Sequence, residues 1–239
     1  YECDASRTVP LPVIFSYLEH LRWEWIQQPD LGLVPYLNEG HFFVVQQQVA
    51  EVVRRVGVST RIKVRGVFER VGRSQAVVRH AILRESDGAL LVDARVWGLW
   101  LGPTRRLVRI PDETRAAAAK DKLDDLIPEA ARTVPPRDGG SETSFIAPPE
   151  TLYESIGLEV DLPDEVGPGA TTSEETVRPS DLDIFDHVNA SNWLRLIDDA
   201  RLHGARSGDL PESALRPSRR AIIHHPREAC LGDVLRVET

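Results

Sequence analysis

Side chains that can carry out acid–base chemistry gather in one short segment of the second half of the chain. Asp181, Asp183 and His187 fall within seven positions. After them, apolar residues recur every three or four positions, which predicts an amphipathic helix: Trp193, Leu196, Ile197 and Ala200. A carboxylate and an imidazole would therefore lie at a helix N-terminus, where free N–H groups and the helix dipole favour negative charge. A hydrolase needs such surroundings for an oxyanion.

The same segment resembles a known family. Residues 181–183 (Asp-Leu-Asp) and 187–189 (His-Val-Asn) match in register the motif of the acyl-ACP thioesterases, which are hot-dog-fold thioesterases. Phe185 stands where that family carries Asn. The resemblance implies an α+β, tandem (double) hot-dog fold, in which each repeat is an antiparallel sheet wrapped round a central helix. The alternative interpretation is an acidic turn that caps an ordinary helix.

A second part of the resemblance lies near residue 228. Residues 226–233 (PREACLGD) are similar to the Arg-Arg-Glu-Cys segment of the family, and in that register Glu228 falls on the family's catalytic glutamate. Ala229 stands at the place of the family's cysteine and Cys230 follows it directly, so the side chains of Ala229 and Cys230 should face opposite sides of the strand. We expect Cys230 to be a small core residue rather than a nucleophile.

The mechanism that the resemblance implies is attack of an activated water on a thioester. His187 and Glu228 would hold and deprotonate the water, and the amides near Val188 and Asn189 would polarise the carbonyl. Asp183 would orient His187, or would itself be the base or nucleophile, as in the 4-hydroxybenzoyl-CoA thioesterases. This mechanism requires no cofactor and no metal ion.

The chain also contains an internal repeat. Residues 1–25 have the layout of the segment around His187 when Asp4 is placed on Asp183. Thr8 then stands where the second copy carries His187. The first copy keeps the acid and lacks the imidazole, so we expect it to be the non-catalytic one.

The repeat predicts the domain organisation. We expect residues 1–110 to form the first hot-dog repeat, which holds the acyl-chain pocket, and 111–175 to form a helix and a Pro/Gly-rich linker. In the family that this chain resembles, the pocket lies between the helix and the sheet of the first repeat. Four residues here are candidates for its wall, although all could be plain core: Leu18, Trp25, Val64 and Val67. Residues 176–239 would form the catalytic second repeat. Fewer strands follow the second helix than the first, so we expect this repeat to be incomplete at its C-terminus.

The elements that must position these residues follow from periodicity. Helical spacing predicts helices over residues 10–28, 187–206 and 111–127. Alternation with a period of two predicts antiparallel strands between residues 42 and 108. Ser-Asp-Gly at 86–88 predicts a tight hairpin turn within them.

Bulk composition limits the class of protein. Hydrophobic residues make up 41% and charged residues 28% of the chain, which is typical of a soluble globular protein. No apolar run reaches membrane-spanning length, and two cysteines do not make a disulfide framework. A net charge of −8 argues against a nucleic-acid binder. We expect a cytoplasmic protein.

The expected partner is an acyl carrier protein, with a CoA thioester as the weaker substrate. Because carrier proteins are acidic and this chain is also acidic, a local basic patch would be needed to attract them. Three candidates for carrier binding precede the strand that leads to Glu228: Arg216, Arg219 and Arg220. A homodimer is a further open interpretation, because a second copy could complete the second sheet.

Two other classes of function remain open. A hot-dog hydratase would carry its His five residues after Asp, with Asn-Pro between them. Here the separations from Asp183 and Asp181 to His187 are four and six, without that Pro. The other class is a non-catalytic protein that binds acyl thioesters. An assay for hydrolysis with detection of the released thiol separates all three.

Overall fold

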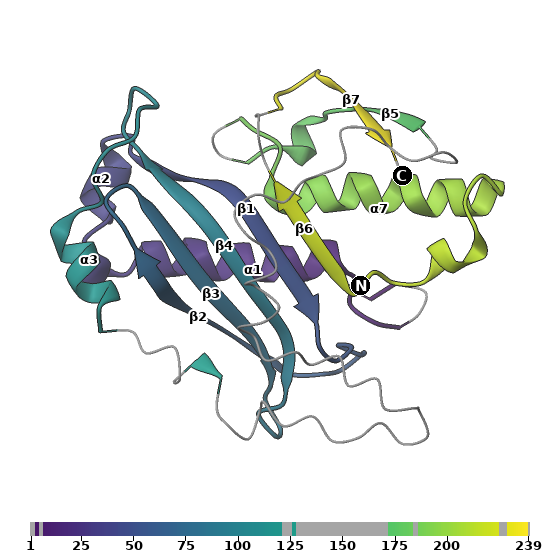
Figure 1. The fold of residues 1–239 in the computed structure, drawn as a ribbon, viewed down its shortest axis with the longest axis horizontal. Helices are drawn as coiled ribbons and strands as arrows, with labels where there is room; N and C mark the ends of the chain where they lie inside the picture. The colour runs from purple at the N-terminus through teal and green to yellow at the C-terminus, as the bar shows by residue number, and fades with distance from the viewer. Residues whose placement is uncertain are drawn as a thin grey trace.

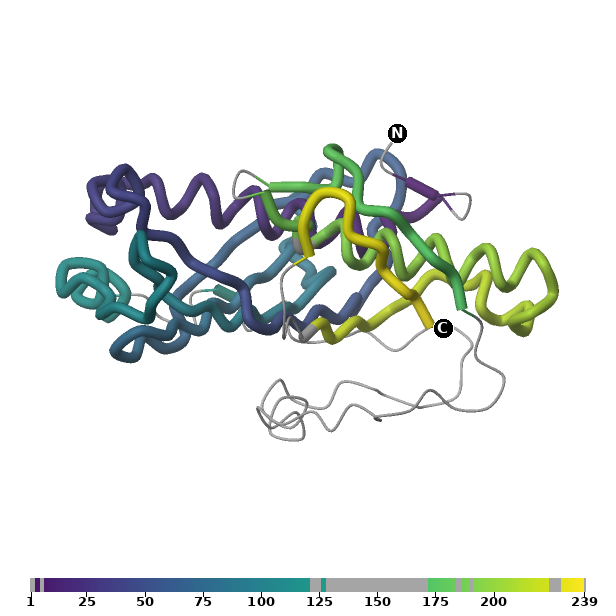
Figure 2. The backbone as a smooth tube through the Cα atoms, turned by 90° about the horizontal axis from the view of Figure 1, so that it is seen from above, coloured from purple at the N-terminus to yellow at the C-terminus, as the bar shows by residue number. Residues whose placement is uncertain are grey.

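The computed structural model describes residues 3–4, 7–120, 126–127, 172–183, 186–224 and 229–238. An antiparallel sheet lies across one long helix, α1 (Leu11–Ile26), and a second long helix, α7 (Ala190–Ser207), lies to one side of it (Figure 1). The view from above shows α1 running along one face of the sheet (Figure 2). No helix of the described residues is long and apolar enough to cross a membrane.

Helix α1 forms because one of its faces is apolar. Leu11, Ile14, Phe15 and Leu18 recur at helical spacing, and all four are buried in one cluster with strand residues that face them. Each such side chain contributes about 1.5–3 kcal/mol when it is fully buried. Pro12 lies in the first turn, where a missing N–H costs nothing. The helix predicted over residues 10–28 is thus confirmed.

The sheet has the strand order β2-β3-β4-β1-β6, and every neighbouring pair is antiparallel. Its strands are β1 (Phe42–Val52), β2 (Ile62–Val71), β3 (Gln75–Arg84), β4 (Leu90–Leu101) and β6 (Arg220–His224). The predicted turn between β3 and β4 is confirmed: Gly88 has a φ of 71°, and the N–H of Arg84 donates to the carbonyl of Ala89 at 2.9 Å.

Two short helices cover one end of α1 and the sheet, α2 (Val34–Asn38) and α3 (Asp112–Ala118). The helix predicted over residues 111–127 is therefore shorter than expected. The N–H of Lys120 donates to the carbonyl of Ala117 at 3.0 Å, three residues back, so the last turn tightens and the helix stops. Residues 121–125 of that prediction lie outside the described part.

The second half of the chain adds α7 and two further strands. β5 (Thr172–Thr176) and β7 (Val234–Glu238) pair with each other in a separate two-stranded sheet. α7 contacts α1, and Gly208 ends it in the left-handed conformation that suits a helix terminus (φ 88°). β6, which follows α7 as β1 follows α1, pairs with β1, so the two halves share one sheet.

The internal repeat is confirmed by hydrogen bonds. The N–H of Asp4 donates to the carbonyl of Thr8 at 3.0 Å, and the N–H of Thr8 donates back to Asp4 Oδ1 at 3.4 Å. Asp183 and His187 make the same two contacts, at 2.8 and 3.3 Å. The residue before Thr8 and the residue before His187 have positive φ angles of 60° and 61°. The chain therefore builds one turn twice, once from Asp4 and once from Asp183.

Candidate active site

A cavity of about 320 Å³ lies between α1 and the sheet and reaches the turn that precedes α7. Aromatic and aliphatic side chains form most of its wall, among them Trp25, Ile26, Phe42, Phe43, Phe68, Val78 and Val96. The rings of Trp25 and Phe68 pack with their centroids 4.4 Å apart. Among the described residues, the ionisable groups in the wall are Glu19, Arg22, Asp183 and His187. The cavity is thus apolar along its length and charged at one side.

Of the residues that sequence suggested for an acyl tunnel, only one lines this cavity. Trp25 is in its wall. Leu18 and Val64 belong instead to the main core cluster, and Val67 packs against a different cluster around Ala81. Alternation along a strand identifies the residues that share a face, but not the part of that face that α1 leaves uncovered.

Asp183 and His187 line the cavity together, as predicted. Asp183 Oδ1 accepts the backbone N–H of His187, and the backbone N–H of Asp183 donates to the His187 carbonyl. The carboxylate therefore fixes the backbone from which the imidazole projects. The first copy of the turn, with Asp4 and Thr8, is not part of the cavity wall.

The oxyanion role expected of Val188 and Asn189 needs correction. The N–H of Val188 donates to the carbonyl of Ala229 at 2.9 Å, and that of Asn189 donates to the carbonyl of Asp181 at 2.8 Å. Both amides are thus used within the protein, because the turn is tied to the strand segment beside it. Asn189 instead caps the helix: its Oδ1 accepts the N–H of Ser191 at 2.8 Å. α7 consequently begins at residue 190, not at residue 187.

Glu19 joins the site from α1, and sequence reasoning missed it. Its Oε1 accepts the side-chain N–H of Asn189 at 2.7 Å, which ties α1 to the start of α7. Burial raises the pKa of Glu19, while the charge of Arg22 and the hydrogen bond from Asn189 lower it. The sequence does carry a signal, since Glu19 and Arg22 occur one turn apart in a helix whose neighbouring positions are apolar.

Arg105 is the second residue that sequence reasoning missed. It lies in the loop after β4, with a φ of 58°, and its Nη2 is 3.2 Å from His187 Nε2. A guanidinium can only donate, so Nε2 accepts this hydrogen bond and the ring proton resides on Nδ1. The nitrogen of His187 that would take a proton from water is therefore held by a cation from the first repeat.

The arginines predicted to bind a carrier lie away from the cavity: Arg216, Arg219 and Arg220. All three are exposed. Arg220 pairs with Glu51 near one end of β1, whereas the cavity reaches β1 at Val45. Six strand positions separate Glu51 from Val45, which is about 20 Å. The premise that these arginines surround the mouth of the site was wrong, because β6 runs antiparallel to β1 and carries them to its far end.

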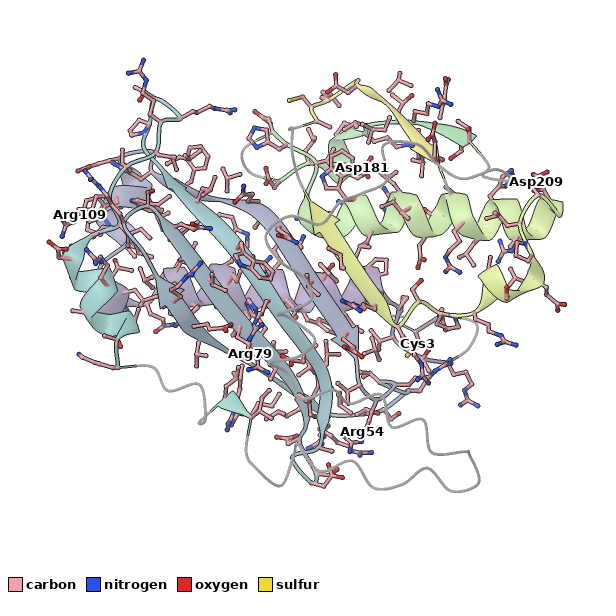
Figure 3. All side chains as sticks on the ribbon, in the orientation of Figure 1. Cys3, Arg54, Arg79, Arg109, Asp181 and Asp209 are labelled. Atoms are coloured by element: carbon pink, nitrogen blue, oxygen red, sulfur yellow. The ribbon has the colours of Figure 1, made fainter. Side chains whose placement is uncertain are left out.

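Asp181, the first acid of the motif, lies near the start of α7 (Figure 3) and has a structural role. It is buried; its Oδ1 accepts a hydrogen bond from Arg195 Nη2 at 2.6 Å, and its Oδ2 accepts the N–H of Arg178 at 2.9 Å. It thereby joins the turn to the first part of α7. Asp181 positions the segment that carries Asp183 and His187, and it does not line the cavity.

Ala229 and Cys230 face opposite sides, as predicted. Ala229 is buried and lines the cavity, and Cys230 is exposed. The expectation that Cys230 fills the core was therefore wrong. Glu228 and Phe185 lie outside the described residues. Among the described residues, no group of three His, Cys, Asp or Glu side chains is arranged to hold a metal ion.

Comparisons with known proteins give matches among solved structures. No protein-family model matches the chain, and no curated protein matches it. A protein of Lactobacillus plantarum provisionally named an oleoyl thioesterase superposes with a TM-score of 0.69 at 18% identity, over 100% of this chain and 79% of its own. A 12:0-ACP thioesterase of Umbellularia californica gives a TM-score of 0.65 at 16% identity, over 99% and 82%. An acyl-ACP thioesterase of Bacteroides thetaiotaomicron gives 0.67 at 16%, over 98% and 79%.

Proposed function

Because this chain has the tandem hot-dog fold, we propose that it hydrolyses fatty acyl thioesters to a free fatty acid and a thiol. The observation that carries the proposal is the apolar cavity that ends at Asp183 and His187. An alkyl chain would fill the apolar part, and the thioester carbonyl would then lie beside a carboxylate and an imidazole. The cavity volume of about 320 Å³ is at the lower end of the range for small-molecule sites.

The proposed chemistry begins with His187. Its Nε2 takes a proton from water once Arg105 has left that nitrogen, and the resulting hydroxide attacks the carbonyl carbon. The tetrahedral intermediate then collapses, and the departing thiolate receives the proton from the imidazolium. Asp183 holds the backbone of His187 through the N–H contact. Glu228 keeps its proposed role as a second group that holds the water.

We propose an acyl carrier protein as the donor of the acyl group, with acyl-CoA as the weaker substrate. Two of the similar structures are named acyl-ACP thioesterases, which supports this choice. Arg105 and the neighbouring Arg106 are exposed next to His187, where they suit the phosphate of a carrier arm. We place the reaction in the cytoplasm, where the free thiols of Cys3 and Cys230 stay reduced.

The test is an assay of hydrolysis. The purified protein is incubated with a series of saturated acyl-ACP and acyl-CoA substrates, and the released fatty acid is quantified by mass spectrometry. The released acid is measured rather than the thiol because exposed Cys230 would react with a thiol reagent. Acid release that His187→Ala abolishes supports the proposal, and absence of release from every substrate overturns it.

A second candidate is an acyl-thioester-binding protein without catalysis. The observation in its favour is the contact of Arg105 with His187 Nε2, which occupies the proposed base. The hydrolysis assay combined with a pull-down separates the two candidates, because a binding protein would retain acyl-ACP unchanged in the pull-down and release no acid.

A further inference from the structure

The cavity wall contains a cationic side chain for which the proposed hydrolysis has no use. Arg22 lies on α1, one turn beyond Glu19, and lines the cavity. Its Nη1 is shielded from solvent and has no hydrogen-bond partner among the described residues. A buried N–H without an acceptor costs free energy, so an arginine in this position calls for an explanation.

In the second repeat, the arginine equivalent to Arg22 has a purely structural role. Arg201 occupies the equivalent position in α7 and donates from Nε and Nη2 to Asp198 Oδ1, at 3.0 and 2.7 Å. Its Nη1 donates to two backbone carbonyls in the segment that follows α7. In the first repeat the acid one turn back is Glu19, whose Oε1 accepts from Asn189 at 2.7 Å. Nη1 of Arg22 therefore lacks, among the described residues, an acceptor like those that satisfy Nη1 of Arg201.

The charges around Arg22 indicate which kind of hydrogen-bond acceptor a substrate would have to supply. Burial lowers the pKa of Arg22 to about 10, and Glu19 opposes that shift, so Arg22 is still a cation at neutral pH. The carboxylates of Glu19 and Asp183 already balance its charge on this side of the cavity. A further carboxylate would be repelled by both, whereas a neutral oxygen would accept the N–H without adding charge.

The position of Arg22 along α1 determines where on a substrate this oxygen would lie. Glu19 touches Asn189, which is two residues beyond His187. Three helical residues take Arg22 about 4.5 Å further along the axis, and the wall beyond it is formed by apolar residues such as Trp25 and Phe68. The acceptor therefore belongs close to the thioester end of the chain and not at its methyl end.

We propose that the cavity is built for an acyl chain with a hydroxyl or keto oxygen on its third carbon, which accepts a hydrogen bond from Arg22 Nη1. The inference rests on the proposed hydrolysis of acyl thioesters at this site. Under this proposal, Arg22 is a specificity-determining residue: it contacts the oxygen on the acyl chain and not the thioester bond that is hydrolysed. The hydrolysis itself proceeds as proposed above, and the oxygen on the chain is unchanged by it.

The experiment compares matched ten-carbon substrates on one carrier: decanoyl, 3-hydroxydecanoyl, 3-oxodecanoyl and 9-hydroxydecanoyl thioesters. We expect kcat/KM for the 3-hydroxy or the 3-oxo substrate to exceed that for decanoyl by about tenfold or more, since a hydrogen bond to a charged donor is at stake. The 9-hydroxy substrate should show no such gain. A wild-type enzyme that prefers plain decanoyl overturns the inference.

Variants of Arg22 test the contact itself. Arg22→Met keeps the volume and removes the donor, so the ratio of kcat/KM for the oxygenated substrate to kcat/KM for decanoyl should fall to about one. Arg22→Gln keeps one N–H donor and should retain part of the preference. The matched control is Arg201→Met in the other repeat, which should leave the preference unchanged. A preference that survives Arg22→Met overturns the inference.

A binding measurement separates this inference from the proposed function. Calorimetry with 3-hydroxydecanamide and decanamide needs no catalysis and adds no carboxylate beside Glu19 and Asp183, and it should give a Kd about tenfold or more lower for the hydroxy amide. If no thioester is hydrolysed but the hydroxy amide still binds tighter through Arg22, the proposed activity fails and the oxygen site stands. Equal binding of the two amides, together with hydrolysis of decanoyl thioester, leaves the activity and removes the oxygen site.

Discussion

His187 and Thr8 occupy the same turn in two copies of one unit, so the molecule contains its own control for the chemistry. His187→Ala should lower kcat by about 10²–10⁴, the range for a lost general base, with little change in KM. Asp4→Asn in the first copy should leave kcat within about threefold of wild type, because that turn does not line the cavity. Steady-state kinetics with one substrate compare the two. Loss of activity in Asp4→Asn alone would mean that the repeats have been assigned the wrong way round.

Asp183 can be tested by keeping or removing its acceptor atom. Asn retains an oxygen for the N–H of His187, so Asp183→Asn should reduce kcat less than His187→Ala does. Asp183→Ala removes that oxygen and should reduce kcat more than Asp183→Asn. If Asp183→Asn is as inactive as His187→Ala, the carboxylate is itself the base or nucleophile.

His80 should give the protein acid sensitivity. Its ring is fully buried, and burial together with the charge of Arg22 lowers its pKa well below the usual 6.5. The unfolded chain takes up a proton below pH 6.5 and the folded one does not. Stability should therefore be lost as pH falls, by about 1.4 kcal/mol per pH unit from this group. Urea titrations from pH 5 to 7 should show a shallower dependence in His80→Leu, while the exposed control His20→Gln keeps the wild-type slope.

At the scale of residues, sequence could reveal the half of the site that is local. Asp183 and His187 are four positions apart, so one turn brings them together whatever the rest of the chain does. The contacts of Glu19 with Asn189 and of Arg105 with His187 span 170 and 82 residues. The spacing of Glu19 and Arg22 marks a charged position on α1, but the partner in either contact cannot be predicted from the sequence, because each contact depends on how α1 and the loop after β4 pack against the second repeat.

Arg105, in the loop after β4, lies closer to the cavity than Arg219 and Arg220 at the start of β6. Substitutions at the two places should therefore affect KM differently. Arg105→Glu should raise KM for both acyl-ACP and acyl-CoA, since both substrates carry phosphate and Arg105 lies beside His187. Arg219→Glu with Arg220→Glu, about 20 Å away by strand spacing, should raise KM only for acyl-ACP, through contact with the body of the carrier. KM measured at two salt concentrations tests this. An equal effect of both changes on acyl-CoA would contradict it.

The turn before α7 depends on one buried carboxylate. Asp181→Ala removes the acceptor of Arg195 and Arg178, and it should lower the free energy of unfolding by about 2 kcal/mol. Activity should fall as well, since the turn carries His187. Asp199 is the matched control, because it pairs with the same Arg195 at an exposed position. Asp199→Ala should change stability by less than about 0.5 kcal/mol in thermal denaturation.

Among the helices and strands, periodicity predicted which elements form, whereas the predicted start of α7 was wrong because its capping residue was not recognised. α1 and the strands of the first sheet follow from alternating and helical spacing, which reflects a face that must be buried. α7 begins three residues later than predicted, because Asn189 is the cap and the preceding residues pair with the strand segment at Ala229. Of the two amides assigned to an oxyanion, that of Val188 is used in this pairing and that of Asn189 donates to the carbonyl of Asp181.

For the molecule as a whole, the repeat could be predicted but the shared sheet could not. The correspondence of Asp4 with Asp183 is visible in the sequence, and the two turns make the same hydrogen bonds. The pairing of β6 with β1 has no counterpart in the pattern of either strand, since an apolar strand does not specify its neighbour. The domain limits at 110 and 176 stay a prediction, although β6 crosses from one proposed repeat into the sheet of the other.

The pairing of β6 with β1 also determines when the sheet can be completed during synthesis of the chain. A ribosome that has released β1 must still add about 170 residues before β6 emerges, which takes about 10–30 s. During that interval β2, β3, β4 and β1 can form a four-stranded sheet, yet one edge of β1 has no partner. A nascent chain is therefore exposed to pairing with another chain along Gln47–Glu51, the stretch that β6 later covers.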